Sequence, residues 1–110
     1  MHEHLPRPGL ARCLAALALL ACGTSQAQDA RALHNQALAA TCANCHGTQG
    51  RAVDGAAVPG LAGMPATYLV EQLKAFKAGA RPATVMQQIA KGYSEAQIDT
   101  LAAYFAAQKK

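Results

Sequence analysis

The segment Cys42-Ala43-Asn44-Cys45-His46 brings two thiols and an imidazole close together, in the order Cys-x-x-Cys-His. This spacing is the attachment signal for a c-type haem. The two thiols are about one helical turn apart, so each can add to one vinyl group of the same porphyrin. His46 is then placed to bind the iron from one side. The pattern predicts a single haem attached covalently through Cys42 and Cys45, with His46 as its proximal iron ligand.

Three other uses of a cysteine pair compete with haem attachment. A disulfide between Cys42 and Cys45 would leave His46 without a role. A thioredoxin-like redox pair is expected beside a βαβ pattern, which the chain does not contain. A structural zinc ion takes four ligands, and His34 would have to supply one of them from the middle of a helix. We therefore favour haem and keep the disulfide as the main alternative.

A second axial ligand must come from elsewhere in the chain, and methionine is the ligand that raises the reduction potential of a cytochrome. Met86 follows a break at Arg81-Pro82, where the chain has had length enough to fold back over the opposite haem face. Met64 still lies within the loop expected to cover the His46 side, where a flexible gap-filler fits well. His34 is expected to be a partly exposed helix residue. We expect Met86 as the distal ligand and keep Met64 as the alternative.

Helical periodicity supplies the elements that would position these groups. In the second expected helix, for example, Leu69, Leu73 and Phe76 recur at helical spacing and Gly79 follows. No segment alternates between apolar and polar residues like a strand, so the fold class is all-α. We expect four short helices, over about Ala30 to Ala40, about Ala66 to Ala78, Thr84 to Lys91, and one that begins after a capping box of Ser94 and Gln97.

The sequence between these helices also points to a bound cofactor. Residues 47–66 are rich in Gly and Pro and read as one long loop. A structureless loop of this length is uncommon in a compact domain unless it wraps something. Much of the apolar composition is Ala, which fills little volume, and a domain this small is marginally stable and usually adds a disulfide, metal or cofactor. A haem would fill the core and give the loop something to cover.

The N-terminal segment has the pattern of an export signal. Leu14 to Ala21 is an apolar run too short to span a bilayer, with Arg7 and Arg12 before it and small residues after it. We therefore expect a signal peptide over residues 1–27 and one monohaem domain over residues 28–110 in the periplasm. As an alternative, the sequence around Cys22 is similar to a lipobox, and lipidation there would anchor the chain on the periplasmic side of a membrane.

The charge of the chain excludes one class of partner. Ten Lys and Arg residues against six Asp and Glu residues give a formal net charge of +4, and the basic residues are scattered. A nucleic-acid surface needs basic residues clustered on one face or along one helix. We expect no nucleic-acid partner, and a membrane only if Cys22 is lipidated.

The motifs together resemble a class I c-type cytochrome over essentially all of the expected domain. Within that class, residues 81–86 followed by 89–94 look like the haem subunit of flavocytochrome c sulfide dehydrogenase. The residues that carry the class resemblance are Cys42 to His46, Pro59 to Gly63, Tyr68-Leu69, Gln72-Leu73, Phe76-Lys77, Gly79 to Arg81, Met86 and Ala102 to Phe105.

The resemblance implies specific roles for six residues. Cys42 and Cys45 would carry the thioether bonds, and His46 and Met86 would bind the iron on its two faces. The carbonyl of Pro59 would accept the proton on Nδ1 of the histidine, a contact that fixes the ring. Arg81 would lie near a haem propionate. The class also crosses its first and last helices, which would place Leu33 or Ala37 against Leu101, Tyr104 or Phe105.

These expectations define a protein that transfers single electrons and is not itself an enzyme. An iron with both axial positions filled has no site for substrate. The resemblance implies a redox partner, a flavoprotein sulfide dehydrogenase that would oxidise sulfide and pass electrons to this haem. The alternatives are a free soluble carrier to a terminal oxidase or other reductase, a haem enzyme with an open sixth position, and a thiol–disulfide protein without haem.

Overall fold

The computed structural model describes residues 26–110. The chain divides into two units between Leu33 and His34. Of the first unit, residues 26–33 are described and are helical. The expected signal peptide and the lipidation at Cys22 fall on residues outside the described part, apart from residues 26 and 27 of the former. All the candidate site residues belong to the second unit, and the fold is described for that unit alone.

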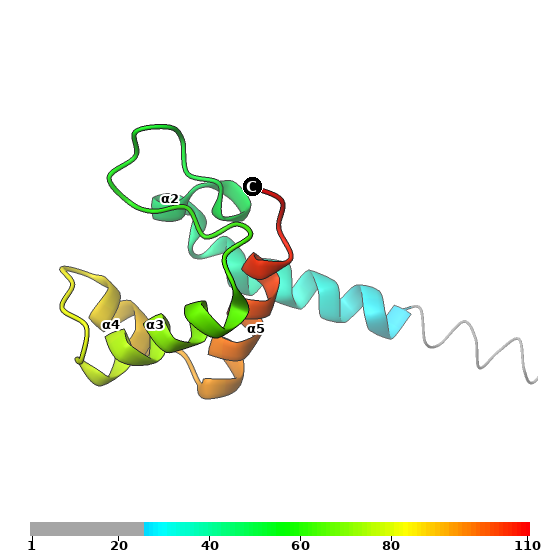
Figure 1. The fold of residues 1–110 in the computed structure, drawn as a ribbon. Helices are drawn as coiled ribbons and strands as arrows, with labels where there is room; N and C mark the ends of the chain where they lie inside the picture. Colours follow the sequence, from blue (N-terminus) through cyan, green and yellow to red (C-terminus); the bar gives the residue numbers. More distant parts are fainter. Residues whose placement is uncertain (1–25) are drawn as a thin grey trace, which may run out of the picture. The chain divides into compact units, whose positions relative to one another are not determined.

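The second unit is built from helices and connecting loops. The residues that the structure describes contain no strand, which confirms the all-α class (Figure 1). None of the helices in that part of the chain is long and apolar enough to cross a membrane. After a helical stretch over residues 34–40, the elements are α2 (Ala43–His46), the 3-10 helix η1 (Thr48–Gly50), α3 (Ala66–Ala78), α4 (Met86–Lys91) and α5 (Glu95–Ala106).

The ends of α3 and α5 form as their sequences predict. Gly79 ends α3 with a left-handed backbone (φ 76°), a conformation that a residue with a side chain adopts less easily. At the start of α5 the Ser94 hydroxyl accepts the backbone N–H of Gln97 at 3.2 Å, and the Gln97 side chain accepts the N–H of Ser94 at 2.8 Å. This reciprocal capping box satisfies two donors that the helix leaves unpaired.

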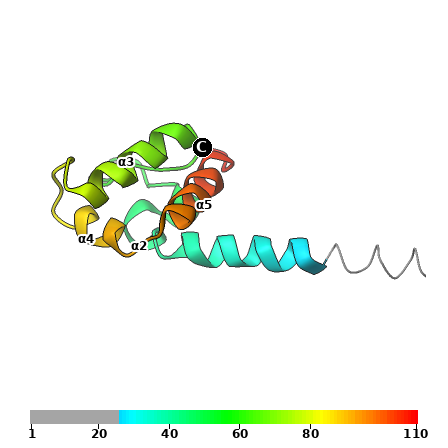
Figure 2. The same cartoon turned by 90° about the horizontal axis from the view of Figure 1, so that it is seen from below.

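The core lies where α3 meets α5. Leu69 of α3 packs in one cluster with Leu101, Ala102 and Phe105 of α5, and Ala39 completes this cluster. Helix α3 contacts both α4 and α5, and two views of the fold place α4 beside the C-terminal end of α3 (Figures 1 and 2). This cluster does not fill the whole unit. Helices α3, α4 and α5 leave an open face, and large apolar side chains line the space there but do not fill it.

The loop between η1 and α3 is held in place by backbone contacts. The N–H groups of Leu61 and Ala62 both donate to the carbonyl of Gly50, at 2.7 and 3.1 Å, so the loop closes on itself. Gly50 has φ 77°, and a Cβ there would lie 2.8 Å from a ring carbon of Phe105. Further on, the N–H of Gly63 donates to the carbonyl of Phe105 at 2.9 Å. The loop is thus docked onto the end of α5.

Several boundaries differ from the sequence predictions. The first helix is already formed at residue 26, before Ala30. Helix α4 begins at Met86 because Val85, with φ −125°, is not helical, which moves the start two residues beyond Thr84. Four residues after Cys42 form the separate helix α2, which the sequence did not suggest.

The residue that joins the first helix to the core also differs from the implied one. Ala39 is buried there at 4% exposure and Leu38 is half-buried beside it, whereas Ala37 is exposed. The implied contact of Ala37 with α5 is therefore wrong. The sequence pattern does not distinguish these positions, because both are alanines in a run rich in Ala.

Candidate functional site

A cavity of about 440 Å³ occupies the open face between the loop and helices α3, α4 and α5. Its volume is within the usual range for a cofactor pocket. Most of its wall is apolar. All six residues predicted from the sequence line this one cavity, together with large side chains from the helices: Cys42, Cys45, His46, Pro59, Arg81 and Met86, with Leu61, Leu69, Leu73, Phe76, Ile89, Leu101 and Phe105.

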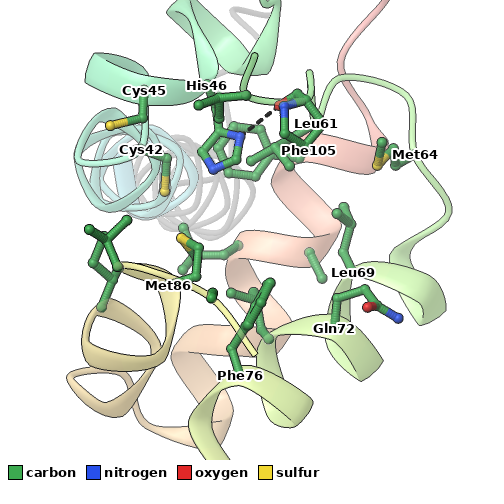
Figure 3. Close-up of a pocket in the computed structure, with 18 of the residues that line it drawn as sticks. Cys42, Cys45, His46, Leu61, Met64, Leu69, Gln72, Phe76, Met86 and Phe105 are labelled. Atoms are coloured by element: carbon green, nitrogen blue, oxygen red, sulfur yellow. Dashed lines mark hydrogen bonds between the residues drawn. The ribbon is translucent and has the colours of Figure 1, made fainter. Parts of the chain in front are cut away.

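The two cysteines lie at one side of the cavity (Figure 3). Cys42 is the residue before α2 and its carbonyl accepts the N–H groups of Cys45 at 3.3 Å and of His46 at 3.0 Å, so one turn fixes all three residues. Both thiols are free. Burial raises the pKa of the Cys42 thiol; the hydrogen bond between Cys42 and Thr41 opposes this effect, and the neighbouring Cys45 adds to it. A turn of this kind presents two thiols to a single ligand.

The imidazole of His46 is buried, at 9% exposure, and its orientation is set by the loop. Its Nδ1 lies 2.7 Å from the carbonyl oxygen of Pro59. A carbonyl can only accept, so Nδ1 carries the proton and donates it. The lone pair is then on Nε2, which points into the cavity (Figure 3). This is the arrangement of a histidine prepared to bind a metal ion.

Met86 is the first residue of α4 and lies across the cavity from His46, as Figure 3 shows. Met64 also lines the cavity, but it is packed against the core cluster and lies at the side away from Cys42. His34 is exposed and is not among the lining residues. Met86 therefore lies opposite the histidine, and Met64 lies at the edge of the cavity.

Arg81 is held at the cavity by two side chains of α3. Its guanidinium carbon lies 4.5 Å from the centre of the Phe76 ring, a cation–π contact. The guanidinium also donates to the side-chain oxygen of Gln72. Sequence reasoning placed Phe76 and Gln72 on a helix but assigned neither to this arginine, because the contact depends on how the irregular segment after Gly79 turns back.

The cavity fits a haem. Three large apolar residues that line the cavity are exposed: Tyr68 (44%), Val85 (55%) and Ile89 (42%). A large apolar ligand in the cavity would bury them. The two thiols suit covalent attachment to a haem, and an imidazole nitrogen and a thioether are ligands that suit its iron. In residues 26–110 there is no group of three or more His, Cys, Asp or Glu side chains that could hold another metal ion, so the zinc alternative has no support.

The fold and the site together define an all-α domain with a covalent haem site. Comparison with known proteins gives the family directly: residues 32–109 match the family model described as cytochrome c. The chain belongs to the cytochrome c family.

Individual relatives agree with this assignment. The chain is 45% identical over 71 residues to a "Thiosulfate dehydrogenase electron acceptor" of Thiomonas intermedia (strain K12), covering 64% of this chain and 33% of the relative. It is 40% identical over 68 residues to a "Cytochrome subunit of sulfide dehydrogenase" of Chlorobaculum tepidum, covering 62% of this chain and 60% of the relative. The chain therefore spans less than two thirds of the length of these relatives.

A solved structure shows the same fold. The cytochrome c4 of Acidithiobacillus ferrooxidans is 39% identical and superimposes with a TM-score of 0.57, covering 60% of this chain and 37% of that one. The family carries haem c attached through a cysteine pair, and Cys42 and Cys45 have the attachment spacing. The chain is an electron-transfer cytochrome, in agreement with the electron acceptor, cytochrome subunit and cytochrome c4 that it is similar to.

Proposed function

We propose that residues 28–110 form a monohaem electron carrier in which His46 and Met86 bind the iron on opposite faces. The observation that carries this proposal is the position of Met86 across one apolar cavity from His46, with both cysteines at its side (Figure 3). Haem c, when bound, supplies the Fe(III)/Fe(II) couple through which single electrons pass. The chain supplies the ligands and the surroundings that tune this couple.

Each cavity residue has a definite task in this proposal. Pro59 keeps the proton of His46 on Nδ1, so that Nε2 is available and the ring does not rotate. The thioether of Met86 would bind the iron, which would leave it no site for substrate. The apolar wall excludes water, and a low-dielectric surrounding together with a methionine ligand favours the reduced state. Arg81, held by Phe76 and Gln72, would offer a positive charge to a propionate.

The first test compares oxidised and reduced optical spectra of the wild-type protein, Met86→Ala and Met64→Ala. Ferric haem with a methionine ligand is expected to give a weak long-wavelength absorption band, the methionine band. We expect this band in the wild type and in Met64→Ala, and we expect its loss in Met86→Ala. Met64→Ala is the matched control, because it removes the other methionine that lines the cavity. A wild-type protein with a high-spin spectrum and no such band would instead indicate an open-site haem enzyme.

We also propose that the electron donor is a dehydrogenase of a reduced inorganic sulfur compound. The resemblance favours a flavoprotein sulfide dehydrogenase, and the names of the relatives, an electron acceptor of thiosulfate dehydrogenase and a cytochrome subunit of sulfide dehydrogenase, support the class of donor. Oxidised protein would be mixed with either dehydrogenase and its substrate, with substrate alone as the control. Reduction of the haem that requires both the sulfide dehydrogenase and sulfide supports the proposal. If neither dehydrogenase reduces the haem, the result would favour a free carrier that serves another donor.

The cellular location follows from the expected signal peptide. We propose export to the periplasm with cleavage after Ala27, and lipid anchoring at Cys22 is the competing possibility. The mass of the purified protein separates the two, since the first chain begins at Gln28 with one haem and the second begins at Cys22 with added acyl chains.

A further inference from the structure

The side chains of Thr41 and Tyr93 form a hydrogen bond whose role the proposed function does not include. The two oxygens lie 2.8 Å apart and the residues are 52 positions apart in the sequence. Thr41 directly precedes Cys42, and Tyr93 lies between α4 and α5. Both residues line the cavity. The bond therefore connects the part of the wall that carries the cysteines to the part that carries Met86.

The direction of this bond is fixed by a second one. The Thr41 hydroxyl donates its only proton to the carbonyl of Leu38, at 2.8 Å. It can therefore only accept from the tyrosine, and the phenol of Tyr93 is the donor. Loss of either hydroxyl would remove the bond, and Ser at position 41 could still accept it.

Tyr93 is also anchored through its backbone. Its carbonyl accepts the side-chain nitrogen of Lys77 in α3, at 2.6 Å. Its N–H donates to the carbonyl of Ala90 in α4, at 3.2 Å. These contacts hold the backbone of Tyr93 against α3 and α4. The position of the phenol therefore depends on the position of α4.

Other links between these two parts of the wall are scarce. Among the hydrogen bonds of residues 26–110, the bond from Tyr93 to Thr41 is the one that joins residues 34–63, which carry the cysteines and His46, to residues 80–94, which carry Met86. Helix α4 packs mainly on α3, and α2 packs mainly on η1. In this part of the chain, the bond is therefore the direct hydrogen-bonded link between the segment that carries Met86 and the segment that carries the cysteines.

We propose that Tyr93 and Thr41 are positioning residues that keep Met86 in place across the cavity from His46. The inference rests on the proposed His46 and Met86 ligation. With the bond intact, α4 cannot swing away from the cysteine-bearing segment without losing it. Without the bond, Met86 leaves the iron more readily and an added ligand can enter in its place.

The experiment is a titration of the oxidised, haem-loaded protein with imidazole, followed by the loss of the methionine band. The apparent affinity for imidazole depends on how easily Met86 is displaced. A hydrogen bond contributes modestly to a closed state, so Tyr93→Phe and Thr41→Val should each tighten imidazole binding about two- to tenfold. The double variant should tighten it no further than one single variant, because both changes remove the same bond.

Two further variants separate positioning from a general loss of stability. Thr41→Ser keeps an acceptor and should bind imidazole like the wild type. Tyr104→Phe removes a phenol of the same chemistry that has no hydrogen-bond partner in the described residues and packs against Phe105; it should also leave the affinity unchanged.

The outcomes are distinct. Unchanged imidazole affinity in Tyr93→Phe and Thr41→Val, or an equal gain in Tyr104→Phe or Thr41→Ser, would overturn this inference while leaving the ligation intact. A wild-type protein without the methionine band would overturn the ligation, and this inference with it. Tighter binding confined to the two variants that lack the bond is the expected result.

Discussion

The most direct test of the loop geometry is a comparison of Gly50→Ala with Gly55→Ala. Both glycines have φ 77°, so an added Cβ meets the same backbone strain at each position. The surroundings differ. A Cβ at Gly50 would lie 2.8 Å from Phe105 Cδ1 and 2.9 Å from the backbone nitrogen of Ala62, whereas a Cβ at Gly55 would meet nothing within 4 Å. The pair therefore isolates the effect of the close approach.

The expected magnitudes follow from these two terms. The left-handed backbone costs an alanine about 1–2 kcal/mol, and the less flexible unfolded chain offsets about 0.4–1 kcal/mol of it. Gly55→Ala should therefore lower the free energy of unfolding by about 1 kcal/mol or less. Gly50→Ala adds an overpacking term of about 1–3 kcal/mol, because neither Phe105 nor the backbone at Ala62 can move without disturbing the core.

The assay is urea unfolding of the oxidised, haem-loaded protein, followed by far-UV circular dichroism. A shift in midpoint at constant slope reports a change in stability alone. We expect Gly50→Ala to be less stable than Gly55→Ala by about 1–3 kcal/mol. If the two variants differ by less than about 0.5 kcal/mol, which is the scatter of neutral surface changes, then Gly50 is not confined by Phe105 and the description of the docked loop is wrong.

Three further changes test other parts of the fold. Ile98→Ala removes a side chain with 0% exposure and should lower the free energy of unfolding by about 2–5 kcal/mol in the same urea assay. Ser94→Ala removes one half of the capping box and should lower it by about 1 kcal/mol. Hydrogen bonds from Lys74 and Lys77 lower the pKa of Glu95. Ionised Glu95 therefore stabilises the fold above its unfolded pKa, and this contribution is lost as the pH falls through the folded pKa. At pH 7 the wild type should therefore have a higher melting temperature than Glu95→Gln. This difference in melting temperature should shrink in acid and in high salt.

Each of these expectations has a contrary result. An Ile98→Ala variant within about 1 kcal/mol of the wild type would mean that the site collapses to fill the space. A Ser94→Ala variant of unchanged stability would show that the capping box is formed but contributes nothing. If the difference in melting temperature between the wild type and Glu95→Gln grows in acid, the pH dependence of stability is opposite to the one expected. The ion pairs with Lys74 and Lys77 are then not the source of the difference.

The sequence was sufficient to predict those elements whose signals are local. The bounds of α3 were predicted as Ala66 to Ala78, because its apolar residues recur at helical spacing and a glycine follows. The capping box of α5 is likewise contained in four consecutive residues. The hydrogen bond from His46 to Pro59 was implied by resemblance alone, since no spacing rule connects a histidine to a carbonyl in the following loop.

Features that depend on long-range packing were beyond the sequence. The bond between Thr41 and Tyr93 joins residues 52 positions apart, and each residue has an ordinary local role as a turn or linker residue. Burial of Ala39 instead of Ala37 depends on how the helix is rotated about its axis. In both cases the energy that decides the arrangement comes from the partner surface, which the local pattern does not encode.

The partner of His46 is a main-chain carbonyl, and this has a consequence for how the protein can vary. Exchanging the side chain at position 59 would not delete the acceptor, whereas a carboxylate or amide partner could be lost in one substitution. The basicity of the imidazole therefore depends on the path of the loop, which Gly50, Leu61 and Gly63 hold by backbone contacts. Point substitutions in the loop would be expected to adjust the electronic environment of the iron in small steps, through shifts in one interatomic distance, while the contact itself persists.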